Sequence, residues 1–274
     1  MKRISALLLA ALMLLTACFA FTACGGGRDY SSLAIVDLGL EREYFGIAFR
    51  AGSDMTRKVE DITLQLINDG KLAALSTTYE VAAVGKGDYT PVADPCEGSG
   101  DWAYIQGKGT LVVGITDYPP MDYRDANGKW IGFDADYARA VAEKLGVEVE
   151  FKEIDWDFKQ EALESKDIDC IWNGMTITDV IEVYADCTVP YMYNTQVAVV
   201  KKADAEKYKT IDDLAGLRIA AESGSAGETV IKENAALAGG LKSMSGQTDA
   251  MLEVLSGSSQ AAIVDLTLAK ALIK

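Results

Sequence analysis

Short strand patterns alternate with helix-spaced segments along most of this 274-residue chain. Residues 111–113 form an apolar run, and residues 134–145 carry apolar side chains at helical spacing and end at Gly146. Residues 147–151 then alternate as a strand, and the same rhythm continues to a strand at residues 261–264. Alternating strands and helices form mostly parallel sheets with covering helices, so the pattern predicts an α/β fold.

One stretch, residues 79–109, interrupts this rhythm. It contains Pro91 and Pro95 together with several Gly and Asp residues, and a stretch of this length without an element is unusual inside a compact domain. We therefore interpret it as a linker. The other helices are predicted at residues 56–68, 72–79, 158–164, 229–237 and 249–255, and the other strands at residues 168–172, 196–200 and 218–221.

The first 23 residues have the pattern of an export signal. Lys2 and Arg3 precede an apolar run without charge. Two segments that end in Cys18 and Cys24 resemble the lipobox of bacterial lipoproteins, in which the Cys is acylated. Cys24 is the favoured anchor because three glycines follow it as a flexible tether, and Cys18 is the alternative. An uncleaved membrane helix remains open, since about 20 apolar residues can span a bilayer.

Composition excludes several classes of function. The formal net charge of −15 opposes nucleic-acid binding, which needs a basic surface; the acidic residues suit a soluble secreted surface. The chain contains no His, which removes Ser-His-Asp and Cys-His nucleophiles and nearly all zinc and facial-triad iron sites. No Gly-Lys pair is followed by Ser or Thr as in a phosphate loop. We expect no enzyme, metal or cofactor, although carboxylate-only catalysis stays open.

Several segments resemble one family. Residues 132–136, Gly-Phe-Asp-Ala-Asp, and the helix after them resemble the signature of the family-3 extracellular solute-binding proteins, the polar amino acid receptors of ABC importers. Further matches lie at residues 169–178, 190–191, 224–225 and 262–265. Residues 44–50 and the helices up to Tyr79 look like the closing segment of that family. The resemblance implies an α/β, two-lobed type II periplasmic-binding-protein-like fold whose lobes are joined by hinge strands near residues 45–49 and 195–200.

The order of these segments differs from that of the family. The closing segment normally follows the helix that matches residues 266–273, whereas here it comes first. The chain therefore looks circularly permuted, and a truncated tandem of two receptors is the alternative. The expected parts are a signal peptide (1–23), an anchor and tether (24–27), part of lobe 2 (28–45), the closing part of lobe 1 (46–83), a permutation linker (84–108), the main part of lobe 1 (109–195) and the main part of lobe 2 (196–274).

The resemblance also implies a ligand cleft beyond the strand ends, where open α/β sheets place ligands. Tyr118 and Trp156 are the expected aromatic walls, which can sandwich an apolar or cationic group; ordinary core packing is the alternative for each ring. Asp265 is expected to pair with the ammonium group of the ligand. The other expected contacts are Asn173, Gly174, Met175 and Thr176, together with Ser225 and Ala226 at a helix start whose N–H groups can hold a carboxylate.

One position departs from the family pattern. The family has an Arg that clamps the α-carboxylate of the ligand by a two-pronged contact, and this chain has Ile181 there. The remaining partners for a carboxylate are the N–H groups of the helix start, Thr176 or a cation such as Arg218. An amino acid bound in an altered way is favoured over an amine without that carboxylate.

Cys96, Cys170 and Cys187 lie beyond the anchor region. A disulfide is permitted in an exported protein, and Cys170 and Cys187 fall in the same expected lobe, so they form the candidate pair. Two buried thiols that act as small apolar side chains are the alternative.

The function that the resemblance implies is that of an exported lipoprotein on the outer face of the cytoplasmic membrane. It would capture a small polar solute, with an amino acid favoured, and deliver it to an ABC importer whose permease and ATPase are separate chains. We expect a monomer that binds no nucleic acid. A ligand-sensing module for a signalling partner remains an alternative, as does a carboxylate-dependent, dehydratase-like enzyme.

Overall fold

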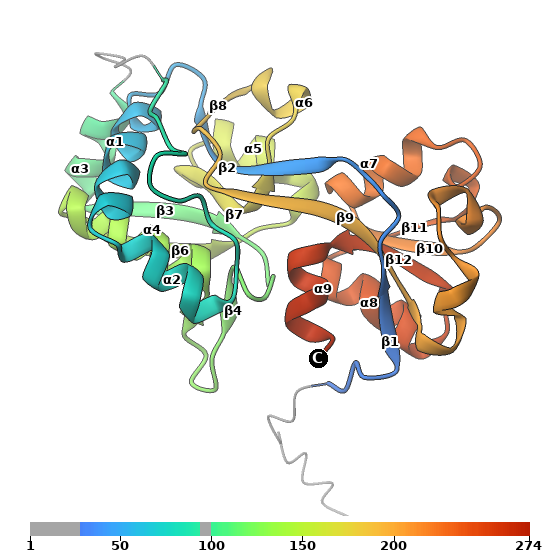
Figure 1. Cartoon of the computed structure of the whole chain (residues 1–274). Coiled ribbons are helices and arrows are strands. Elements are labelled where there is room, and N and C mark those ends of the chain that lie inside the picture. The colour runs from blue at the N-terminus through green and yellow to red at the C-terminus, as the bar shows by residue number, and fades with distance from the viewer. Residues whose placement is uncertain (1–27, 94–99) are drawn as a thin grey trace, which may run out of the picture.

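The computed structural model describes residues 28–93 and 100–274. The expected signal peptide, the candidate anchors Cys24 and Cys18, and Cys96 lie outside these residues. Within the described ranges, no helix combines the length and the apolar character needed to cross a bilayer. The described residues form an α/β structure with two lobes, which Figure 1 shows side by side.

Lobe 1 contains helices on both faces of its strands. Its elements are β2 (Arg42–Arg50), α1 (Met55–Asn68), α2 (Lys71–Tyr79), α3 (Asp101–Lys108), β3 (Thr110–Ile115), β4 (Tyr123–Arg124), β5 (Trp130–Ile131), α4 (Phe133–Leu145), β6 (Glu148–Glu153), η1 (Trp156–Phe158), α5 (Lys159–Glu164), β7 (Cys170–Thr176), α6 (Asp179–Glu182) and β8 (Ala185–Cys187). β4 and β5 form a separate hairpin.

Lobe 2 is built around three parallel strands. Its elements are β1 (Leu33–Val36), η2 (Lys202–Lys207), η3 (Ile211–Leu214), β10 (Ile219–Glu222), α7 (Ala226–Glu233), η4 (Ala238–Gly240), β11 (Leu241–Met244), α8 (Gln247–Ser256), β12 (Ala261–Asp265) and α9 (Leu266–Leu272). The structure starts α7 three residues before the predicted helix, because Ser225 caps it through a bond from the N–H of Glu228.

One strand, β9 (Met192–Lys201), runs through both lobes. Residues 192–195 pair with β2 of lobe 1, and residues 196–200 pair with β12 of lobe 2. β1 lies on the other side of the second half of β9, and the chain then passes from β1 to β2, which makes a second connection. The described strands thus follow the order β11-β10-β12-β9-β2-β7-β3-β6 in one continuous sheet.

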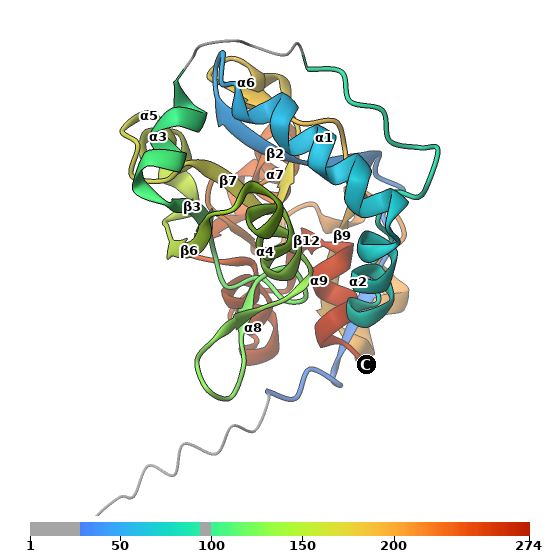
Figure 2. The same ribbon diagram turned by 90° about the vertical axis from the view of Figure 1, so that its left-hand side faces the viewer.

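The early segment is an integral part of lobe 1. β2 lies between β7 and β9, and α1 and α2 pack against α4, as Figure 2 shows. Val59, Ile62 and Leu66 form the buried face predicted for α1, and Leu72 of α2 is also buried. Without this segment, lobe 1 would lose an internal strand and the cover of α4.

The Gly-Phe-Asp motif at residues 132–134 has a clear physical role at the start of α4. Gly132 has φ 130°, and a Cβ at that position would lie 2.1 Å from the carbonyl oxygen of Met121, so no other residue fits without a backbone shift. Asp134 is buried, and it accepts hydrogen bonds from the N–H of Gly174 at 2.7 Å and from the hydroxyl of Tyr191 at 2.8 Å. The motif therefore fastens α4 to β7.

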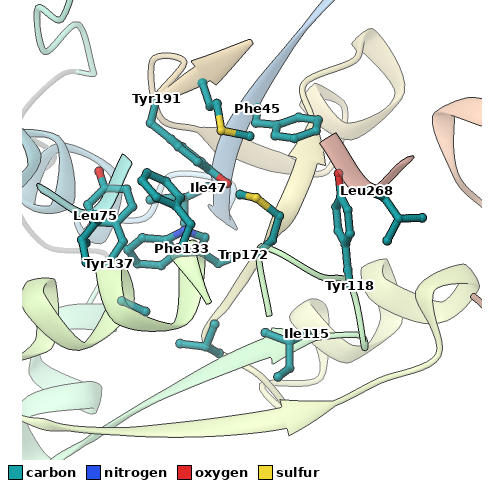
Figure 3. Close-up of a cluster of buried hydrophobic side chains, with 14 of the residues drawn as sticks. Phe45, Ile47, Leu75, Ile115, Tyr118, Phe133, Tyr137, Trp172, Tyr191 and Leu268 are labelled. Carbon is teal, nitrogen blue, oxygen red and sulfur yellow. The ribbon is translucent and has the colours of Figure 1, made fainter. Parts of the chain in front are cut away.

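Large aromatic side chains fill the core between α4 and the sheet. The rings of Tyr137 and Trp172 meet edge to face at 4.7 Å, and Tyr191 packs against Tyr137 at 5.6 Å. Figure 3 shows these rings together with Phe133 and Phe45, the latter from the early segment. Long-range packing of this kind ties the two ends of the sequence into one core.

The expected linker, residues 84–108, is not free of secondary structure, because it ends in α3. This helix starts after Gly100 and stops at Gly109, which has the left-handed conformation that ends many helices. Ile105 is its fully buried apolar side chain. A helix with so narrow an apolar face gives little periodicity in sequence, which is why the prediction missed it.

The expected disulfide between Cys170 and Cys187 is wrong for this structure, in which both are free thiols. Cys170 lies on β7 and pairs with Phe49 on one edge of β2. Cys187 lies on β8 and pairs with Ala48 on the opposite edge of β2. Two strand spacings amount to roughly 9 to 10 Å, beyond the Cα separation that a disulfide can bridge. The alternative of buried thiols describes Cys170.

A buried ion cluster joins the early segment, α3 and β7. Arg50 donates to Asp101 at 3.1 Å and to the carbonyl oxygens of Leu163 and Ile168, and it lies 3.7 Å from Asp169. Asp169 is inaccessible to solvent and also accepts from Lys108 at 2.6 Å. The cluster therefore links three segments that are distant in sequence.

Replacing Arg50 with Met is expected to lower the free energy of unfolding by about 3 kcal/mol, because breaking a buried pair leaves groups without their partner. The matched control is Lys144→Met, which removes an exposed pair with Asp69 and should cost less than about 0.5 kcal/mol. Urea unfolding followed by circular dichroism measures both. Equal effects of the two substitutions would contradict the role given to the cluster.

Candidate functional site

The expected ligand residues lie where strands of both lobes end. Tyr118 follows β3, Trp156 follows β6 and Asp265 ends β12. These three side chains are 3%, 7% and 4% exposed. The lobes also touch here, because Lys159 of lobe 1 donates to the carbonyl oxygen of Gly224 of lobe 2 at 2.9 Å. The structure is therefore a closed form with the candidate site at the contact between the lobes.

Tyr118 and Asp265 are brought together across the lobes. Burial raises the pKa of Tyr118, and the nearby carboxylate of Asp265 adds to this rise. The ring of Tyr118 also lies against Gly174, where a Cβ would stand only 2.5 Å from a ring carbon. Figure 3 shows Tyr118 in the same buried cluster as Leu268 of α9, and the Tyr118 hydroxyl interacts with Asp265 of lobe 2. The phenol thus contacts both lobes.

Asp265 is surrounded by amide groups. Its Oδ1 accepts from Asn194 at 2.5 Å and from Gln196 at 2.6 Å, and its Oδ2 accepts from Gln247 at 2.5 Å. Gln247 also accepts the backbone N–H of Asp265. Neutral donors therefore stabilise this carboxylate without balancing its charge.

Glu43 is a second acid at the site, and the sequence prediction missed it. Its Oε2 accepts from Gln196 at 2.9 Å, from Asn194 at 3.1 Å and from the hydroxyl of Thr176 at 3.3 Å. The amides of Asn194 and Gln196 therefore bridge Glu43 and Asp265. Glu43 belongs to the early segment, and no local pattern marks it, since only the pairing of β2 with β9 places it here.

Glu222 is the third acid, and it is 4% exposed. It ends β10, the parallel neighbour of β12. The rule that selected Asp265, a polar residue at the carboxyl end of a strand, applies equally to Glu222. That signal was present in the sequence and was overlooked.

Burial shifts the pKa values of these acids upward. It raises the pKa of Glu43 to about 7, and the charge of Asp265 adds to the effect. It raises the pKa of Glu222 to about 8, again with help from Asp265 and against the attraction of Lys159. The pKa of Asp265 is also raised by burial, while its hydrogen bonds oppose the rise. The site thus concentrates acids that resist ionisation while they lack a counter-charge.

Trp156 and Lys159 form the wall that faces α7. The Lys159 ammonium lies 5.0 Å from the centre of the Trp156 ring and donates to the carbonyl oxygen of Trp156 at 3.0 Å. Ser225 caps α7, so its hydroxyl already accepts the N–H of Glu228, and Ala226 is the first residue of that helix. Of this pair, Ser225 is buried and Ala226 is partly buried.

Three of the expected residues on β7, namely 173–175, are buried. The side chain of Asn173 exchanges hydrogen bonds with Thr116 and donates to Asp122 at 2.8 Å. The N–H of Gly174 is bound to Asp134, and Met175 is fully buried. The structure therefore engages Asn173, Gly174 and Met175 within lobe 1, while Thr176 reaches the acids.

The structure removes Arg218 as a partner for a ligand carboxylate. Arg218 precedes β10, whose other end carries Glu222, and its Nε donates to the carbonyl oxygen of Ser258. Four residues of strand separate the two positions by roughly 13 Å. Ile181 is buried against Trp156 and Ala185 in one apolar cluster, so a guanidinium is not supplied from that position either.

A cavity of about 1470 Å³ lies between the lobes next to these residues. Its lining includes Tyr30, Tyr79, Tyr123, Tyr193 and Lys270, and it borders the acid cluster through Asn194. Apart from that border it does not include the expected contacts, because the lobes are closed over them. The lining of this cavity also carries charged side chains, among them Arg28, Arg42 and Lys270. The expected contacts gather at the acids, so we place the candidate site there.

Among the described residues, no group of three His, Cys, Asp or Glu side chains is placed to hold a metal ion. Asp265 and Glu43 instead accept hydrogen bonds from side-chain amides. These amides are neutral, so a cationic group of a solute could still pair with the acids. The arrangement suits the recognition of an organic solute.

Known proteins match this chain over part of its length. A family model of the bacterial extracellular solute-binding proteins, family 3, matches residues 111–271. The L-cystine-binding protein TcyJ of Escherichia coli K12 is 35% identical over 131 residues, which cover 47% of this chain and 49% of that protein. The chain thus spans about half the length of the curated relative it matches.

Two solved structures extend the comparison. The arginine-bound form of truncated ArgBP from T. maritima has a TM-score of 0.59 and 34% identity, covering 62% of this chain and 79% of that one. An ancestral amino acid-binding protein, a precursor of cyclohexadienyl dehydratase, has a TM-score of 0.57 and 36% identity, covering 60% and 73%. Both similarities support the two-lobed fold.

The raised pKa of Glu222 predicts how stability depends on pH. A carboxyl group whose pKa is higher in the folded protein favours folding at low pH, and that contribution is lost as the pH rises towards about 8. Where Glu222 is protonated in the folded state but ionised in the unfolded state, the free energy of unfolding falls by about 1.4 kcal/mol for each unit of rising pH. The thermal midpoint of the ligand-free protein should therefore fall by about 3 °C or more between pH 6 and pH 8.

Glu222→Gln should flatten this fall, because the amide keeps the shape and carries no charge. Glu233→Gln, on the exposed side of α7, is the control and should retain the wild-type slope. Differential scanning calorimetry at several pH values measures both. A Glu222→Gln profile that is parallel to wild type would remove Glu222 as the cause.

Proposed function

Because this chain belongs to the bacterial extracellular solute-binding proteins of family 3, we propose that it captures a small polar solute outside the cytoplasm and delivers it to an ABC importer. An amino acid is the first candidate, since relatives are named for binding L-cystine and arginine. The permease and the ATPase would be separate chains, and the receptor would act as a monomer.

The observation that carries the proposal is the meeting of Tyr118 from lobe 1 with Asp265 from lobe 2 at a closed contact between the lobes. A receptor that closes by a hinge motion buries its solute at such a contact. Asp265 would take the ammonium group of the solute in place of its amide donors. Tyr118 and Trp156 would cover the apolar part.

A carboxylate on the solute would have few partners. Ile181 supplies no charge, so the first N–H groups of α7, at Ser225 and Ala226, and the hydroxyl of Thr176 are the proposed contacts. The hinge would lie where β9 passes between the lobes and where the chain enters β2.

Location follows from the family. Its members are extracellular, and we propose that Cys24 carries the lipid that holds this protein at the outer face of the membrane, with Cys18 as the alternative. Transport is favoured over sensing because other relatives are named as binding proteins of ABC transporters. Catalysis is a weaker candidate, although one structural relative is a precursor of a dehydratase; product formation from candidate substrates would reveal it.

We further propose that the segment order is a circular permutation of the family's order. The family match starts at residue 111, yet β2 from the early segment is an internal strand of the sheet. Arg28 and Lys274 both line the cavity between the lobes, so a short connection could join them. This proximity supports a single receptor over a truncated tandem.

A reordered chain tests the permutation. Residues 100–274 followed by a short Gly-Ser linker and residues 28–93 should unfold with a thermal midpoint within about 5 °C of the original order, because every pair of strands and the buried Val84 and Tyr89 are kept. Deletion of residues 28–83 should abolish cooperative unfolding, since an internal strand is lost. A reordered chain that aggregates, beside an original order that folds, would count against the proposal.

Binding of solutes by residues 28–274 tests the function. Titration calorimetry against the common amino acids and small amines should detect at least one solute, and Asp265→Asn should weaken its binding about 30-fold or more, because a buried charge pair is lost. Asp69→Asn, in an exposed pair, should bind as the wild type does. Unchanged affinity of Asp265→Asn would refute the ammonium contact.

A further inference from the structure

The acids at the contact between the lobes favour a solute of positive charge. We infer that the site takes an organic cation with a net positive charge, and that Glu222 and Glu43 recognise this charge in addition to Asp265. This inference rests on the proposed function and deepens it. The solute would be a basic amino acid or an amine without a carboxylate, because both present cationic N–H donors.

The balance of charge at the site is the first argument. In the described part of the chain, none of the ion pairs involves Glu43, Glu222 or Asp265. Lys159 is the cation that faces Glu222, but its hydrogen bonds go to the carbonyl oxygens of Trp156 and Gly224. Three acids therefore face one cation that binds elsewhere. A bound cation would restore the balance.

Buried acceptors without donors are the second, independent argument. Oε1 of Glu222 and Oε1 of Gln196 are buried and accept no hydrogen bond in the described structure. The two residues are 4% and 3% exposed, and an unmet buried acceptor is costly. Oε1 of Gln196 is an acceptor, and so is Oε1 of Glu222 when that acid is ionised, so a donor group satisfies both. An ammonium or guanidinium group is such a donor.

The third argument is that neither of the two positions considered for a carboxylate partner, Ile181 and Arg218, supplies a guanidinium at the acids. Ile181 is apolar and Arg218 lies at the far end of β10. A zwitterion of zero net charge would bring a carboxylate into a place that already holds three acids. A basic amino acid brings the same carboxylate but adds a second cationic group, and a diamine brings no carboxylate, so both balance the acids better than a neutral zwitterion does.

The protonation of the acids supports the same conclusion. Burial raises the pKa of Glu43 to about 7 and that of Glu222 to about 8. Asp265 is the charged group that faces both Glu43 and Glu222. Lys159 and Asp155 also face Glu222, and Tyr118 faces Asp265. A bound cation favours the ionised acids, so binding should release protons and should strengthen as the pH rises from 6 to 8.

The experiment is a calorimetric panel with residues 28–274 at pH 7. The probes are L-arginine, L-lysine and 1,4-diaminobutane as cations, L-glutamine and L-cystine as neutral amino acids, and L-glutamate. At least one cation should bind 100-fold or more tightly than every neutral probe. Titration in buffers of different ionisation enthalpy should show proton release on binding.

Two variants identify the residues involved. Glu222→Gln should weaken the cation at least 10-fold, while Glu233→Gln on the exposed side of α7 should leave it unchanged. Ile181→Arg distinguishes the two kinds of cationic solute. It should strengthen the binding of a basic amino acid, because the carboxylate gains a partner, and it should weaken the binding of a diamine. If Glu222→Gln fails to fold, the pH dependence and proton release of the wild type still decide.

The outcomes separate this inference from the proposed function. Tight binding of a neutral or acidic amino acid, without binding of any cation, would overturn the cation inference and support solute capture. Binding of a cation with no proton release and no effect of Glu222→Gln would overturn the role of the acids. A panel in which nothing binds would count against both.

Discussion

The pairing of β2 with β7 and β9 is the constraint on which the rest of the structure depends. β2 comes from the first fifth of the chain, and its two partners come from the second half. Because an internal strand donates and accepts on both edges, removing it would expose two rows of unpaired backbone groups. The same pairing carries Glu43 to the lobe contact and Arg50 to the buried ion cluster. Fold and site therefore depend on one long-range contact.

The chemistry of the site follows from where the strands end. β10 and β12 are parallel neighbours, so their last residues, Glu222 and Asp265, reach the same edge of the sheet. Closure of the lobes removes water from both acids, and burial raises their pKa values. The amides of Asn194, Gln196 and Gln247 offer hydrogen bonds without charge. The site therefore has no counter-ion of its own among these groups, and a cationic donor from a solute would bind strongly there.

Much of the fold was predictable, because the alternation of strands and helices is a local property. The helix faces of α1 and α4 and the strand that ends in Asp265 were found where the sequence placed them. Glu43 could not be found, since its neighbours at the site are more than 130 residues away. Glu222 could have been found by the rule that selected Asp265. The disulfide of Cys170 with Cys187 was wrong because sequence distance does not reveal that β2 separates them.

The sequence by itself determined the class of the protein: its α/β rhythm, its lack of histidine, its family motifs and the loss of the Arg at Ile181. These features are local or compositional, so they need no knowledge of contacts. Only the tertiary structure decided that the early strand is internal to the sheet, that α3 forms inside the linker and that three acids meet at one contact. Each of these results depends on which distant segments pack together, because burial and charge at a site are set by its neighbours in space and not by its neighbours along the chain.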